Sequence, residues 1–149
     1  MSVIRIGAAR IVPSDAGTYR LSLDGDWAAI LPVRDEDHEL VNLCAWFPDA
    51  PGRWWLRFSD ECFFLGARAL TVAAYFGDPI ELHATSEAWA VAGGRGACAL
   101  RWDVDLRPWF EGISAVRCDS QTLAARFQTA MRRWEPKTTI SRVETHHAA

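Results

Sequence analysis

The sequence lacks the features that most readily place a chain in a functional class. It has one lysine, Lys137, against fifteen arginines, and its formal net charge is −3. This balance argues against a nucleic-acid partner held by a broad basic face. No apolar run approaches the roughly 20 residues of a membrane-spanning helix, and no charged and then apolar signal segment opens the chain. We therefore expect a cytoplasmic, bacterial-type protein without a membrane partner.

Cysteine pairs with the spacing of a zinc or redox motif are also missing. Cys44, Cys62, Cys98 and Cys118 stand far apart, and no two of them form a C-x-x-C motif. Four reduced and mostly buried thiols are the simplest interpretation. No motif in the chain indicates a cofactor, so none is expected.

The composition is that of one ordinary domain. The chain has 149 residues, of which 50% are hydrophobic and 23% are charged, so it has enough material for a sizeable core. Eight tryptophans are the outlier, and tryptophan is enriched both in cores and at interfaces. Residues 123–149 carry a net charge of +3 on an otherwise acidic chain. Such a segment is typical of a solvated helix end, with a contact surface as the alternative.

The first part of the chain has the pattern of antiparallel strands. Alternating apolar residues and turn signals mark them, with Asp24-Gly25 and the segment 48–52 as turns. The predicted strands cover residues 3–6, 18–23, 27–33, 40–47 and 53–58, with a short helix as the alternative for 40–47.

The second part alternates between strands and helices. A helix is predicted at 67–76, with Leu65, Ala69, Val72, Ala73 and Phe76 on its inward stripe. A last amphipathic helix at 121–134, capped by Asp119 or Ser120, turns Leu123, Phe127, Ala130 and Trp134 inward. Between them we expect strands at 80–84, 97–102 and 114–118, a helix at 85–93 and a helical turn at 105–112.

These elements predict an α+β fold in a single domain. Antiparallel N-terminal strands are joined to a βαβ-like C-terminal part that ends in the amphipathic helix. The domain covers residues 1–135, and residues 136–149, which lack an apolar pattern, form a flexible C-terminal tail.

The hexapeptide Arg53-Trp54-Trp55-Leu56-Arg57-Phe58 carries the strongest functional signal. In a strand, Trp54, Leu56 and Phe58 point to one face, which we assign to the core. The other face then presents Arg53, Trp55 and Arg57 to water, as a recognition patch or as arginines packed on an indole. Trp and Arg dominate interface energies, so this face is the interface candidate. Stacking of nucleic acid on Trp55 and membrane insertion are weaker alternatives.

Three aspartates follow predicted strands and form the best enzymatic alternative. Asp103 and Asp105 come after the strand at 97–102, and Asp119 comes after the strand at 114–118. Ligands bind at the carboxyl ends of strands in open α/β sheets, and carboxylates there suit Mg²⁺ or Mn²⁺ and phosphate-containing substrates. Aspartates in these positions more often cap the next helix. A Cys98–His83 nucleophilic pair is a third, weaker candidate.

Three segments together carry a family resemblance: residues 45–57, residues 77–85, and residues 88–93 running into 97–100. The chain resembles a group of small uncharacterised bacterial proteins associated with plasmids and integrated mobile elements. The resemblance covers roughly residues 40–120. It implies an intracellular accessory role with a protein or nucleic-acid partner, and it brings no activity, cofactor or catalytic residue.

From these observations we expect a cytoplasmic accessory protein that acts by binding a macromolecule, either a protein partner or its own copy as a homo-oligomer. The binding surface is predicted at Arg53, Trp55 and Arg57. The alternative is a metal-dependent enzyme with Asp103, Asp105 and Asp119 as ligands.

Overall fold

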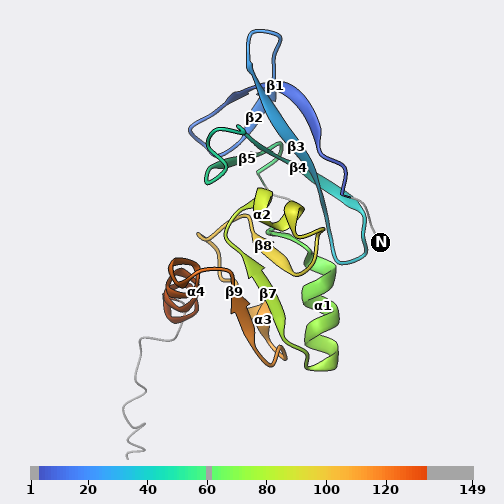
Figure 1. The fold of residues 1–149 in the computed structure, drawn as a ribbon, viewed down its shortest axis with the longest axis vertical. Helices are drawn as coiled ribbons and strands as arrows, with labels where there is room; N and C mark the ends of the chain where they lie inside the picture. Colours follow the sequence, from blue (N-terminus) through green and yellow to red (C-terminus); the bar gives the residue numbers. More distant parts are fainter. Residues whose placement is uncertain (1–3, 60–61, 134–149) are drawn as a thin grey trace, which may run out of the picture.

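The first half of the chain forms a five-stranded antiparallel sheet in the computed structural model, which describes residues 4–59 and 62–133 (Figure 1). The strand order is β2-β1-β3-β4-β5. The strands are β1 (Gly7–Pro13), β2 (Tyr19–Leu21), β3 (Asp26–Arg34), β4 (Leu40–Trp46) and β5 (Trp54–Leu56).

This first sheet curls until its two edges meet. Thr18, just before β2, forms an isolated parallel bridge with Leu56 of β5, and the Leu56 N–H donates to the Gly17 carbonyl at 3.0 Å. The curl encloses one face of the sheet, so side chains from different strands of the same sheet fill the interior. This inner core consists of Ile11, Tyr19, Ala28, Ala45 and Trp55, all 7% exposed or less.

The second half of the chain forms a four-stranded mixed sheet in the order β6-β8-β7-β9. Strand β7 (Ile80–His83) runs parallel to both β8 (Ala97–Ala99) and β9 (Val116–Cys118), whereas β6 (Phe64–Leu65) is antiparallel to β8. The helices are α1 (Ala67–Phe76), α2 (Ser86–Val91), α3 (Arg107–Phe110) and α4 (Gln121–Arg133). Side chains of α1, α3 and α4 pack on one core with this sheet.

A third core joins the two sheets into one unit. Leu31, Cys44 and Leu56 of the first sheet pack against Leu65 and Cys98 of the second, all of them buried. Apolar area removed from water on both sides holds the halves together at about 25 cal/mol per Å². The predicted mixed α+β fold in a single domain, antiparallel first and alternating later, is therefore confirmed.

Most predicted elements are present, with one displaced and one missed. The strand expected at residues 3–6 is wrong for 4–6, which lie outside any strand; β1 begins at Gly7. The residues Gly7, Ala8 and Ala9 have low β propensity, so their side chains do not predict a strand. The segment is a strand because it pairs with β3. The two-residue strand β6 was too short to carry a pattern.

The predicted inward face of α1 is confirmed for Leu65, Ala69 and Ala73 and is wrong for Val72 and Phe76. The helix buries Ala67, Leu70 and Ala73, whereas Val72 is 45% exposed and Phe76 is 68% exposed. Apolar residues surround most of this helix, so two stripes compete for the core. The close packing under the helix selects the stripe with small alanines.

The C-terminal helix agrees with its prediction within the part of the chain that the structure describes. Leu123 and Ala130 are buried, Phe127 packs against the same core, and the Ser120 hydroxyl accepts from the Leu123 N–H at 3.1 Å as the N-cap. Trp134 and the proposed tail 136–149 lie outside the described residues. No described helix is long and apolar enough to cross a membrane.

Candidate functional site

Trp55 belongs to the inner core of the first sheet and not to a water-facing surface. It is 7% exposed, and its ring meets that of Phe47 edge-on at 5.4 Å between centroids. The expected exposure of this residue is therefore wrong. As expected from alternation, Trp55 and Leu56 point to opposite faces of β5. Both faces of β5 are covered by a core, because the sheet curls on the Trp55 side and packs against the second sheet on the Leu56 side.

The two flanking arginines lie at the rim of this core. The Arg53 guanidinium lies 5.1 Å from the centre of the Trp55 ring, so the packing of arginine on indole is the arrangement that forms. Arg57 donates to the Tyr19 carbonyl at 3.4 Å and lies over the ring of Phe58. Arg53 is exposed, Trp55 is buried and Arg57 is half-buried, so the trio makes no continuous exposed patch.

The three predicted metal ligands do not converge. Asp103 receives two hydrogen bonds from Arg101, at 2.8 and 3.0 Å, and Asp105 receives two from Arg107, at 2.9 and 3.0 Å. These hydrogen bonds lower the pKa of both carboxyls. Asp119 accepts from the Ala84 N–H at 3.1 Å. Among residues 4–59 and 62–133, no group of three His, Cys, Asp or Glu side chains is arranged to hold a metal ion.

His83 and Cys98 are cross-strand neighbours but do not form a nucleophilic pair. Burial raises the pKa of the Cys98 thiol, so the nucleophilic thiolate is disfavoured. The His83 Nε2 lies 2.9 Å from the Arg95 carbonyl oxygen, which can only accept. His83 therefore donates through Nε2, and its Nδ1 faces Asp119 at 3.9 Å. The Nε2 hydrogen bond fastens the loop before β8 to the end of β7.

A cleft of about 620 Å³ lies between the first sheet and the carboxyl end of β8. The strand end contributes Leu100 to Asp103, which is the region of an α/β sheet where ligands bind. We call it the inter-sheet cleft. Its polar and aromatic lining comprises Asp15, Thr18, Arg53, Trp54, Ser59, Arg101, Trp102, Asp103 and Arg126.

Three arginines reach the inter-sheet cleft from three separate elements: Arg53 before β5, Arg101 after β8 and Arg126 on α4. Arg101 is held by Asp103 and by the Ser59 carbonyl. Arg53 and Arg126 form no ion pair with any carboxylate in the described part of the chain. Among the described residues of the lining, Asp15 is the remaining acidic side chain.

The Arg126 guanidinium lies 4.6 Å from the centre of the Trp102 ring, the shortest such distance in the described residues. Burial against this wall lowers the pKa of Arg126, although an arginine remains charged at neutral pH. The indole Nε1 of Trp102 is buried and has no hydrogen-bond partner among residues 4–59 and 62–133. Such a group costs free energy in the folded state and is a donor without an acceptor.

The other tryptophan of the cleft is fully engaged. The Trp54 indole donates to the Leu100 carbonyl at 3.1 Å and so fastens β5 to the end of β8. Trp54 therefore joins the two sheets along one wall of the cleft, and Arg126 stacked on Trp102 forms another.

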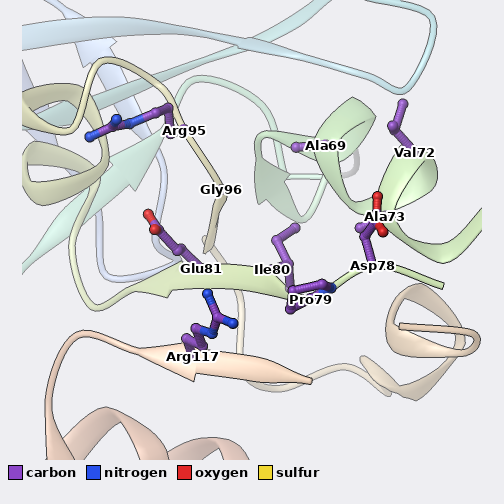
Figure 2. A pocket seen from close by; sticks show the side chains of 10 residues that line it. All are labelled: Ala69, Val72, Ala73, Asp78, Pro79, Ile80, Glu81, Arg95, Gly96 and Arg117. Carbon is purple, nitrogen blue, oxygen red and sulfur yellow. The ribbon is translucent and has the colours of Figure 1, made fainter. Parts of the chain in front are cut away.

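A second pocket, of about 360 Å³, lies at the opposite, amino end of the parallel strands (Figure 2). Figure 2 shows charged side chains of Glu81, Arg95 and Arg117 along one part of it, and Ala69 and Ala73 of α1 along another. It contains none of the predicted site residues.

Sequence reasoning found two members of the inter-sheet cleft, Arg53 and Asp103, but for other reasons. It missed Arg101, Trp102 and Arg126. Arg101-Trp102 at a predicted strand end was the available signal, because residues after parallel strands line ligand sites. The pairing of Arg126 with Trp102 spans distant positions and has no local pattern.

Comparisons of the chain with protein-family models, with curated proteins and with solved structures give no match. The association with plasmids and mobile elements therefore stays a prediction.

Proposed function

We propose that this protein acts by binding a partner protein, and that it captures an acidic side chain or segment of that partner in the inter-sheet cleft. The observation that carries the proposal is the convergence of Arg53, Arg101 and Arg126 on one cleft, two of them without an acidic partner in the described residues. Arginine binds carboxylates in a bidentate manner and is enriched at interfaces.

The aromatic lining supports a protein partner. Trp54 and Trp102 offer large, rigid contact area, and tryptophan with arginine supplies most of the strong anchor points at protein interfaces. We propose as well that the protein is cytoplasmic and that it has an accessory role associated with mobile genetic elements. The four free cysteines support the reducing compartment.

Calorimetric titration with a glutamate-rich peptide tests the proposal. Arg126→Ala should weaken binding by about tenfold, which corresponds to about 1.4 kcal/mol, because a charge-assisted hydrogen bond is lost. Asp15→Asn should strengthen binding, because it removes an opposing acid that forms no ion pair within the described residues of the cleft lining. Arg20→Ala is the matched control, since Arg20 is exposed and lies outside the cleft.

Two comparison ligands complete the experiment. A lysine-rich peptide should not bind, and binding of the acidic peptide should weaken with added salt. Equal affinity in wild type, Arg126→Ala and Asp15→Asn would contradict the proposal. Capture of an oligonucleotide in place of the acidic peptide would replace the protein partner by nucleic acid.

A further inference from the structure

Helix α1 presents large apolar side chains to solvent on a single stripe. Val72, Tyr75 and Phe76 are 45%, 82% and 68% exposed, and we call them the α1 ridge. The Tyr75 and Phe76 rings meet edge-on with centroids 4.9 Å apart. Their spacing of three and four residues puts all three on one side of the helix. Large apolar side chains gathered in one place, unlike single ones, mark interaction surfaces.

One residue of the ridge, Val72, lines two hollows. It shares the pocket of Figure 2 with Pro79 and Ile80. It also borders a mostly apolar groove of about 590 Å³, whose lining includes Leu31, Pro32 and Trp89. A protruding apolar ridge beside a mostly apolar groove is the shape that a self-complementary surface requires, since each copy must supply both parts.

Charges at the two ends of the ridge define one orientation. Arg68 is exposed in the first turn of α1, and Asp78 is exposed just after its end. Neither forms an ion pair within residues 4–59 and 62–133. Ten residues of helix span about 15 Å, so the two charges lie at opposite ends of the stripe.

An antiparallel pair of α1 helices satisfies both features at once. A two-fold axis that crosses the exposed side of α1 at the height of residue 73 along the helix places Arg68 of one copy opposite Asp78 of the other. The symmetry repeats this contact. The same axis brings Tyr75 of each copy beside the Val72 edge of its partner's hollows. A parallel pair would instead set Arg68 against Arg68 and Asp78 against Asp78.

We propose that the α1 ridge is the self-association surface of this protein and that its occupant is a second copy of the chain, with the two α1 helices antiparallel. The surface shares no residue with the inter-sheet cleft, so the dimer and the acidic-partner site are independent. In the dimer, the two clefts remain available for partners.

Sedimentation equilibrium across a wide range of protein concentrations tests this inference by exchanging the charges. Arg68→Asp alone and Asp78→Arg alone should each weaken the dimer by at least about tenfold, because each creates two like-charge contacts. The double exchange Arg68→Asp/Asp78→Arg should restore an affinity close to that of the wild type. Tyr75→Glu should abolish the dimer, and Arg20→Asp is the matched control for an exposed charge reversal.

The outcomes show whether a variant loses the dimer because the α1 ridge is altered or because the monomer is unfolded. They also show whether the dimer contact lies on another face of the protein. Circular dichroism melting of each variant shows whether the monomer is folded, which an exposed substitution should preserve. A wild-type monomer at every concentration would overturn the inference, as would a double exchange as weak as the single ones. A dimer that survives Tyr75→Glu would place the contact elsewhere.

Discussion

The inner face of the first sheet and the helix-covered face of the second sheet are filled in different ways. Strand residues of one sheet, such as Ile11, Tyr19 and Trp55, fill the inside of the curl without help from a helix. The second sheet is covered by α1, α3 and α4, with alanines such as Ala67 and Ala73 at the contact. Large side chains of the curled sheet fill its interior together with Ala28 and Ala45, whereas the alanines of α1 allow this helix to approach the second sheet closely.

The surroundings of each element decide where an apolar side chain stays exposed. Around β5 both faces of the first sheet are covered, so even an aromatic residue between two arginines is buried, whereas Leu21 and Trp27 on other strands are each 60% exposed. In the second half, the short helix α1 buries one narrow stripe against the core and leaves Val72, Tyr75 and Phe76 exposed. Burial follows the architecture around an element more than the apolarity of the element itself.

The largest expected effect tests the interior of the curl. Trp55→Ala should lower the free energy of unfolding by about 3–5 kcal/mol, because it leaves a cavity that other strands cannot fill. Urea denaturation measures the loss, and Arg53→Ala at the exposed neighbouring position should cost less than about 1 kcal/mol. A decrease of less than about 1 kcal/mol in the free energy of unfolding of Trp55→Ala would indicate that Trp55 is exposed to solvent.

The second sheet should be most sensitive where its backbones approach closely. Gly66, between β6 and α1, has φ 78°, and a Cβ there would overlap the Gly96 carbonyl oxygen before β8. Gly66→Ala should therefore cost at least about 2 kcal/mol in urea denaturation. Gly93→Ala is the matched control, because Gly93 has φ 74° in open space and isolates the cost of the dihedral angle. Equal losses would show that the close approach is unimportant.

The core between the two sheets should respond to alkaline pH. Burial raises the pKa of Cys44 from 9.0 to about 12, and that of Cys98 also rises. Above pH 9 the unfolded chain releases thiol protons that the folded chain keeps. The free energy of unfolding should therefore fall as pH rises from about 9 toward 12, by about 1.4 kcal/mol per pH unit for each thiol.

Substitution separates the buried thiol from the general effect of alkali. Cys44→Ala should show a shallower decline over this pH range than the wild type, measured by denaturation at each pH. Cys118→Ala, at a half-buried position, should retain nearly the wild-type slope. Parallel slopes in all three proteins would contradict the role of Cys44.

The exposed ion pair of the cleft should matter little for stability. The Asp103 carboxylate is 66% exposed beside Arg101, which lowers its pKa. Its contribution is therefore present above its unfolded pKa near 3.8 and lost as pH falls below it. Asp103→Asn should cost less than about 1 kcal/mol at neutral pH, and Asp24→Asn is the exposed control. A loss of several kcal/mol would indicate a structural role for the pair.

The smallest expected effect concerns metal ions. Because Asp103, Asp105 and Asp119 are each engaged by other groups, Mg²⁺ or Mn²⁺ should leave the melting temperature unchanged. A rise that disappears in Asp103→Ala/Asp105→Ala would reinstate the metal-dependent alternative.

The chain itself determined the order and type of most elements. The apolar period and the glycine after Phe76 set the bounds of α1, and Ser120 began α4 where a capping residue was expected. These signals are local: they depend on spacing and on residues within one turn. They also predicted the antiparallel first half and the alternating second half.

Only the tertiary structure decided which faces were covered. Alternation in β5 predicts that Trp55 and Leu56 point to different faces of the sheet, but it does not predict that the sheet curls and encloses Trp55. The stripe of α1 that meets the core, and the meeting of Arg53, Arg101 and Arg126 at one cleft, depend equally on elements distant in the sequence. Burial and convergence are properties of packing between elements, and for that reason no local pattern contains them.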